Sequence, residues 1–161
     1  MFTFRPTARL TERLGAMPVP HEQPTTTRLG DWYGNLVRFG RQQMILCTSD
    51  RSLLSVVLPA KDVRHSLPLA LPGAVGSLLH GLGVPATQVR AELEAMRDVT
   101  IGKTVSRSVL GSMNDFVFAI QCRLDDEPAV PFDELASWLS ETPCSPLGYD
   151  SPRSAATRLL A

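Results

Sequence analysis

The chain opens with apolar and polar residues in alternation. Phe2 and Phe4 alternate with polar residues, which predicts a short strand with one buried face. Three further runs rich in apolar and β-branched residues are separated only by short polar turns: 32–38, 44–48 and 53–58. Because short connections join antiparallel strands, these runs predict a three-stranded meander. We expect the N-terminal strand to join this meander at one edge.

Later in the chain the apolar spacing changes to that of helices. A long helix is predicted by apolar residues that recur every three or four positions: Leu110, Met113, Val117, Ile120 and Leu124. A strand over 116–122 is the alternative interpretation of this segment. Shorter helical patterns and one short strand complete the prediction: helices near 7–14, 85–96, 132–139 and 155–160, and a strand at 99–101.

Strands come early and helices late, which favours the α+β class. We expect a small antiparallel sheet, the N-terminal strand plus the three-stranded meander, with helices packed on one face. The 161 residues suit a single domain, 1–161. Residues 16–29 are rich in proline and threonine, which predicts a mobile surface loop. Residues 66–89 lack acidic and basic side chains, but their prolines and glycines predict only a short buried helix over 74–82, not a membrane span.

Charge and cysteine content narrow the classes of function. The 16 basic and 16 acidic residues give a net charge of zero, which argues against non-specific nucleic-acid binding. The three cysteines are widely spaced and form no C-x-x-C motif, so we expect neither a disulfide framework nor a metal site. The first residues lack the apolar core of a secretory signal. We therefore expect a cytoplasmic location.

Polar side chains concentrate at the start of the long helix. A P-loop is excluded, because Arg97 stands where the first glycine of that motif would precede Gly102 and Lys103. A weaker anion site remains, since the free N–H groups at a helix start attract anions. The competing interpretation is that Ser106 or Ser108 simply caps the helix.

Two interpretations of the polar residues inside this helix stay open. In one, they make structural hydrogen bonds that fix the helix to neighbouring loops. In the other, they line a pocket in which Asp115, beside Phe116, is partly buried. The candidate ligand-binding residues are Lys103, Thr104, Arg107, Ser108, Ser112, Asn114 and Asp115, with Asp31 and Tyr33 at the rim.

Nucleophilic catalysis and a ligand-stacking site have less support. No histidine stands near a serine or cysteine in a recognisable catalytic arrangement. Cys144 lies between two prolines, and we interpret it as a packed side chain in a rigid loop. Trp32 is predicted to be a core residue, although a carboxylate and an arginine nearby leave a ligand-stacking platform as the alternative.

Four motifs resemble those of a bacterial protein family of unknown function: R-L-G-D-W-Y (28–33), I-G-K-T (101–104), R-S-V-L-G-S-M-N-D-F (107–116) and T-P-C-S-P-L-G-Y (142–149). The resemblance covers nearly the whole chain and implies a compact bacterial cytoplasmic protein, with no activity or catalytic residue to transfer. Asparagines often stand in that family where this chain has Val105 and Ser106. This departure argues against a contact through a side-chain amide at these two positions.

Three functions are compatible with this sequence. The first is a binding module whose polar pocket around 103–115 takes a small anionic or nucleotide-like ligand or a partner segment. The second is a hydrolase or transferase acting on phosphate esters, with Asp115 as general base and Lys103 and Arg107 steadying charge. The third is a homodimeric interaction or accessory protein of a plasmid or defence operon. We favour the binding module.

Overall fold

The computed structural model describes residues 1–161, with the side chain of Pro68 left aside. One mixed sheet of five strands organises the chain, in the order β4-β3-β2-β1-β5. The strands are β1 (Phe2–Pro6), β2 (Trp32–Phe39), β3 (Gln42–Ser49), β4 (Ser55–Pro59) and β5 (Val99–Ile101). The helices are α1 (Ala8–Leu14), α2 (Val63–Gly81), α3 (Ala86–Ala95), α4 (Arg107–Asp126), α5 (Phe132–Leu139) and α6 (Pro152–Leu160), with a 3₁₀ turn η1 (Ser145–Leu147).

The predicted sheet is wrong in two respects, although the meander itself is confirmed. β2, β3 and β4 pair antiparallel, but β1 pairs parallel with β2 on one side and with β5 on the other. Parallel pairing requires a crossover of a dozen or more residues. The long connection between Pro6 and Trp32, which contains α1, supplies one. β5 then takes the edge position that the prediction had given to β1.

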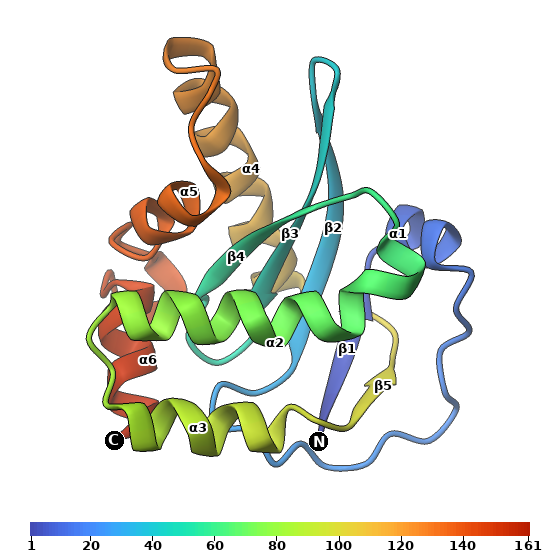
Figure 1. Ribbon diagram of the computed structural model, residues 1–161. Helices are drawn as coiled ribbons and strands as arrows, with labels where there is room; N and C mark the ends of the chain where they lie inside the picture. The colour runs from blue at the N-terminus through green and yellow to red at the C-terminus, as the bar shows by residue number, and fades with distance from the viewer.

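Helices cover both faces of the sheet, so the prediction of helices on one face is also wrong. Figure 1 shows α2 and α3 in front of the strands and α4 behind them. Neighbouring strand residues enter different cores, because side chains alternate across a sheet. Phe4, Trp32 and Val56 pack in the core beneath α2, α3 and α6. Tyr33 and Val57 pack in the core beneath α4 and α5.

The predicted short helix at 74–82 is too short, because α2 begins at Val63 and runs through the prolines at 68 and 72. Each proline removes one backbone hydrogen bond from the helix. The apolar stripe of α2 offsets that loss, since its members are buried against the sheet: Leu67, Leu71, Val75, Leu78 and Leu79. Among the described residues, no helix has both the length and the apolar character needed to cross a membrane.

α4 follows its predicted period closely. Its buried side chains include Met113, Phe116 and Ile120, so the helical interpretation is confirmed and the alternative strand over 116–122 is wrong. The predicted helices at α1, α3, α5 and α6 and the short strand β5 are also confirmed. Phe118 points away from the core and is 72% exposed.

Two glycines give a matched test of packing. A methyl group at Gly34 of β2 would collide with the side chains of Phe4 and Leu10, whereas one at Gly73 of α2 would meet no atom. We expect Gly34→Ala to lower the free energy of unfolding by about 1–3 kcal/mol through overpacking. Gly73→Ala should raise it by about 0.5–1 kcal/mol through helix propensity. Urea unfolding measures both, and equal effects of the two changes would contradict this account of the core.

Candidate functional site

The guanidinium of Arg5 is the centre of a buried charge network on the α4 side of the sheet. Arg5 is 7% exposed and pairs with two carboxylates from different segments. Its Nε and Nη2 donate to Asp31 Oδ2 at 3.0 and 2.8 Å. Its Nη1 and Nη2 donate to the two oxygens of Glu22 at 2.9 and 2.6 Å. Nη1 also donates to the carbonyl oxygen of Lys103 at 2.6 Å.

Asp31 makes two further hydrogen bonds, one through its carboxylate and one through its backbone N–H. Asp31 Oδ1 accepts the backbone N–H of Thr3 at 3.0 Å, and the backbone N–H of Asp31 donates to Asp50 Oδ1 at 3.0 Å. Asp31 therefore fixes β1 to the start of β2 from inside the protein. It was predicted to be a rim residue of a ligand site, but it is 8% exposed and its oxygens are occupied by the chain itself.

The network shifts the protonation equilibria of its members. Burial disfavours the charged guanidinium, but the hydrogen bonds to Glu22 and Asp31 outweigh burial and raise the pKa of Arg5 above its ordinary value. The hydrogen bond with Arg5 lowers the pKa of Glu22. Burial raises the pKa of Asp50, and the negative charge of Asp31 adds to that effect. Arg5 is thus a permanent cation, and the lowered pKa of its partner Glu22 keeps that carboxylate ionised at neutral pH.

Gly102 of the I-G-K-T motif has no room for a side chain. A methyl group there would collide with the carboxylate of Glu22 and with Thr3, and would press on the Arg5 guanidinium. The backbone N–H of Gly102 donates to the carbonyl oxygen of Phe4 at 2.9 Å, which extends the pairing of β5 with β1. The I-G-K-T motif therefore contacts the charge network through its backbone.

The segment 16–29 contributes several anchored contacts to this region. Its Glu22 carries the ion pair with Arg5, and its Val19 N–H donates to the carbonyl oxygen of Ile101 at 2.9 Å. The N–H groups of Arg28 and Leu29 donate to the carboxylate of Glu92 at 2.9 and 3.0 Å. Glu92 lies in α3 and is 2% exposed, so its carboxylate is a buried anchor for this segment.

The start of α4 is held by a hydroxyl pair. Tyr33, 1% exposed, accepts the backbone N–H of Ser106 at 3.1 Å through its phenol oxygen. Ser106 Oγ in turn accepts the N–H of Val109 at 3.2 Å and caps the helix. The capping interpretation of Ser106 is confirmed. Tyr33 is a buried support of this cap.

The other predicted site residues divide by exposure. Lys103, Arg107, Ser108, Asn114 and Asp115 are exposed, Thr104 is half-buried and Ser112 is buried. The expectation that Asp115 is partly buried is wrong. Asp115 lies two turns beyond Arg107, about 12 Å along the helix axis, so the structure does not bring these two charges together. It does bring Lys103, Arg107 and Ser108 to the same end of α4.

Cys144 and Trp32 have the structural positions predicted for them. Cys144 is 6% exposed and Trp32 is 0% exposed. Burial raises the pKa of the Cys144 thiol, and the negative charge of nearby Asp115 raises it further. This places the T-P-C-S-P-L-G-Y segment beside the middle of α4. Within the part of the chain that the structure describes, no three acidic, histidine or cysteine side chains gather where a metal ion could be held.

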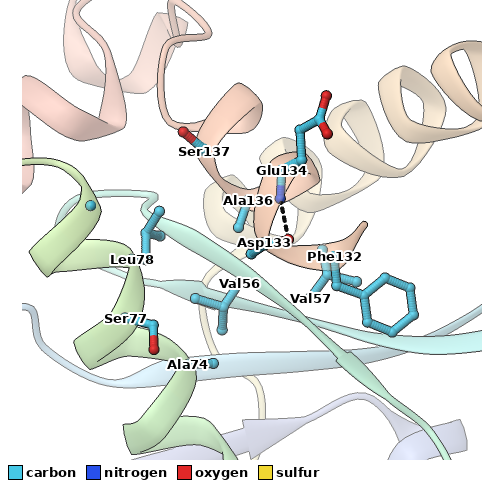
Figure 2. Close-up of a pocket in the computed structure, with 11 residues that line it drawn as sticks. Val56, Val57, Ala74, Ser77, Leu78, Phe132, Asp133, Glu134, Ala136 and Ser137 are labelled. Atoms are coloured by element: carbon cyan, nitrogen blue, oxygen red, sulfur yellow. Dashed lines mark hydrogen bonds between the residues drawn. The ribbon is translucent and has the colours of Figure 1, made fainter. Parts of the chain in front are cut away.

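A groove that was not predicted from the sequence lies on the opposite edge of the sheet. A cavity of about 510 Å³ lies over β4, between α2 and α5 (Figure 2). Its residues are Val56, Val57, Ala74, Ser77, Leu78, Gly81, Phe132, Asp133, Glu134, Ala136 and Ser137. The volume lies in the range of roughly 300–1,000 Å³ typical of ligand sites. The only signal in the sequence was two acids at the start of an apolar helix.

The buried cation gives a first prediction for this region. Arg5→Leu removes the charge and leaves Asp31 buried without its partner, so we expect the free energy of unfolding to fall by about 3–5 kcal/mol. Chemical denaturation measures the change. The exposed Arg9 of α1 offers a matched control, because Arg9→Leu should change stability by less than about 0.5 kcal/mol.

Glu22→Gln gives a prediction with a pH signature. The pKa of Glu22 is lowered in the folded state, so its stabilisation is present above the ordinary glutamate pKa of about 4.5 and is lost as the pH falls. We expect the variant to be less stable than the parent at pH 7 and the difference to shrink below pH 4.5. Glu12→Gln, at an exposed position, is the control. A Glu22→Gln difference that stays constant from pH 7 to pH 3 would contradict the ion pair.

The comparisons with known proteins place this geometry in a family. No curated protein and no solved structure matches the chain. A family model described as a domain of unknown function (DUF6933) matches residues 3–155. The matched range includes Arg5, Asp31, Gly102 and the whole of α4. Because the match covers nearly the whole sequence, the chain belongs to the DUF6933 family.

Proposed function

We propose that this chain is a bacterial cytoplasmic binding module that takes a small anionic ligand, such as a phosphate ester, at the start of α4. One observation carries the proposal. Lys103 and Arg107 are exposed cations with no acidic partner among the described residues. Both stand beside the amino end of a helix of 20 residues, where the helix dipole adds a positive potential.

Backbone groups at the same place favour an anion. The N–H groups of Ser106 and Val109 are occupied by Tyr33 and by the cap. The N–H groups of Arg107 and Ser108 have no partner among the described residues. Two free amides, one hydroxyl and two cations are donors that match the acceptor oxygens of a phosphate group.

The buried network supports this surface from below. The carbonyl oxygen of Lys103 is held by Arg5, and Ser106 is held by Tyr33. The extended segment between them is therefore fixed at both ends, so the donors need little reorganisation when a ligand binds. In this proposal Asp31 and Tyr33 position the site, and Lys103, Thr104, Arg107 and Ser108 contact the ligand.

Hydrolysis of a phosphate ester receives less support. A general base must come within hydrogen-bond reach of the proton that it removes. Asp115 stands about two helical turns from Arg107, so a small ester held by Lys103 and Arg107 would not reach it. Asn114 and Asp115 contribute to the proposed site only if the ligand is long enough to follow the exposed face of α4.

The double variant Lys103→Ala/Arg107→Ala tests the site. We expect it to bind pyrophosphate and ATP at least tenfold more weakly than the parent in isothermal titration calorimetry at low salt, because each charged hydrogen bond contributes about 1.5–3 kcal/mol. The control is Arg41→Ala/Arg90→Ala, which removes the same charge from other exposed positions and should change affinity less than twofold. Equal weakening by both double variants would show a general charge effect and refute the site.

A further inference from the structure

Four cations from different segments of the chain meet around Gln43 of β3. Arg13 of α1 donates through Nη2 to Gln43 Oε1 at 3.3 Å, and Arg38 of β2 is the cross-strand partner of Gln43. Arg64 of α2 donates through Nε to the carbonyl oxygen of Arg13 at 2.9 Å. Lys61 follows the end of β4, which pairs with β3 close to Gln43. Figure 1 shows α1 beside the start of α2, and the four cations, here called the basic surface, gather at this corner of the molecule.

The charges of the basic surface are not neutralised within the chain. All four side chains are exposed, and none of them forms an ion pair with another described residue. The neighbouring acids Glu12 and Asp62 do not pair with them either. Because like charges at close range repel one another, a ligand with several negative charges would stabilise this corner of the protein.

Two guanidinium groups of the basic surface keep hydrogen-bond donors for such a ligand. Within the described chain, Arg64 uses only its Nε and Arg13 only its Nη2 in hydrogen bonds, which leaves their other N–H groups for a ligand. Both residues line a hollow of about 390 Å³, together with His65. A guanidinium group holds a carboxylate or a phosphate through two parallel N–H···O bonds, so this hollow favours an oxyanion.

A second hollow, of about 340 Å³, adjoins the first and is mainly apolar. The two hollows share Asp62 and Val63 in their lining. Pro59 of β4, which is exposed, and Ala70 of α2, which is half-buried, supply apolar surface to the second hollow. Lys61 lines it as well. An aliphatic side chain placed there would be removed from water, with the cations of the basic surface beside it.

A ligand that satisfies both hollows combines several carboxylates with an aliphatic group. We propose that the basic surface binds an acidic segment of a partner protein. Aspartate and glutamate side chains of that segment pair with the four cations, and one of its aliphatic side chains enters the apolar hollow. This surface is independent of the anion site at the start of α4. Leu10 of α1 packs in the core beneath α2, in front of the sheet, whereas α4 lies behind the sheet (Figure 1).

A nucleic acid fits the basic surface less well than an acidic protein segment does. Proteins that bind single strands stack the bases on aromatic side chains, and no phenylalanine, tyrosine or tryptophan lines either hollow. Affinity for a duplex comes from many phosphate contacts, whereas this chain has a net charge of zero. An acidic peptide needs only the local cations, and it supplies the aliphatic side chain that the second hollow favours.

Labelled peptides test the proposal directly. The probe is a fluorescein-labelled nonapeptide with four acidic residues on each side of a central leucine, measured by fluorescence anisotropy with the full chain at low salt. A second peptide has serine in place of the leucine, which tests the apolar hollow. A third has glutamine and asparagine in place of the acids, which removes the charge. A labelled single-stranded DNA of nine nucleotides carries the same charge as the probe and tests a nucleic-acid partner.

The expected order of affinity follows from the two hollows. The acidic leucine peptide should bind about three- to tenfold more tightly than the serine peptide and at least tenfold more tightly than the amide peptide. It should also bind more tightly than the DNA. Amide NMR shifts caused by the peptide should fall in residues 9–13, 38–43 and 61–70 and leave the start of α4 unchanged. Tighter binding of the DNA, or no binding of the acidic leucine peptide, would overturn the proposal.

Two double variants test the cations, with a matched control. Arg13→Gln/Arg64→Gln and Arg38→Gln/Lys61→Gln should each weaken binding of the acidic leucine peptide about three- to tenfold. Arg90→Gln/Arg97→Gln removes the same charge from exposed positions in and after α3 and should weaken binding less than twofold. Equal weakening by all three double variants would show a general charge effect and refute the basic surface.

A single variant tests the apolar hollow without changing any charge. Ala70→Leu fills the hollow, so it should remove the preference for the leucine peptide over the serine peptide while the amide peptide stays the weakest. A preference for leucine that survives this change would contradict the assigned position of the aliphatic side chain. Sedimentation of the free chain completes the test, since self-association that Arg13→Gln/Arg64→Gln abolishes would assign the basic surface to a second copy and refute the proposal.

Discussion

The fold depends on one buried cation. Arg5 lies on β1, and burial of an unpaired guanidinium is too costly for a protein interior. Its partners come from three other places in the chain: Glu22 in the segment before β2, Asp31 at the start of β2 and the carbonyl of Lys103 after β5. Satisfying one charge therefore fixes the position of four segments at the same point.

Several features of the molecule are consequences of this constraint. The mixed sheet places β1 between β2 and β5, so that both acidic and carbonyl partners reach Arg5. Gly102 must lack a side chain because the Arg5–Glu22 pair fills the space. The extended segment that follows Gly102 leads directly to the cap of α4 at Ser106. The charge of Arg5 thus helps to position the polar residues at the start of α4. It does so through the backbone of Lys103, because none of their side chains contacts Arg5.

The sequence predicted those parts of the fold that local patterns determine. α4 was predictable because its apolar period continues over about four turns, and the meander because its connections are short. The parallel pairing of β1 was not, since residue alternation is the same for both directions of pairing. α2 was predicted too short because the cost of Pro72 is local, whereas the burial of Leu71 and Val75 that offsets it is tertiary.

The candidate site was predictable to a similar extent. The concentration of polar residues near Arg107 correctly located the start of a helix and the Ser106 cap. The burial of Arg5 and Glu92 was not predicted. A charged residue between apolar residues is ordinarily interpreted as facing solvent unless its buried partners are known. The groove at β4 was missed for a related reason. Its walls come from α2 and α5, which are separated by some fifty residues of chain.

The central position of β1 also has a consequence for synthesis on the ribosome. β1 leaves the ribosome before the other four strands of the sheet, yet its two neighbours begin at Trp32 and Val99. The edge of β1 that pairs with β5, and the hydrogen bond from Arg5 to the carbonyl of Lys103, therefore remain unmade until residues 99–103 have been synthesised. Such exposed strand edges invite association with other nascent chains. The hydrogen-bond network of Arg5, which stabilises the finished protein, is therefore completed only after β5 and Lys103 have been made.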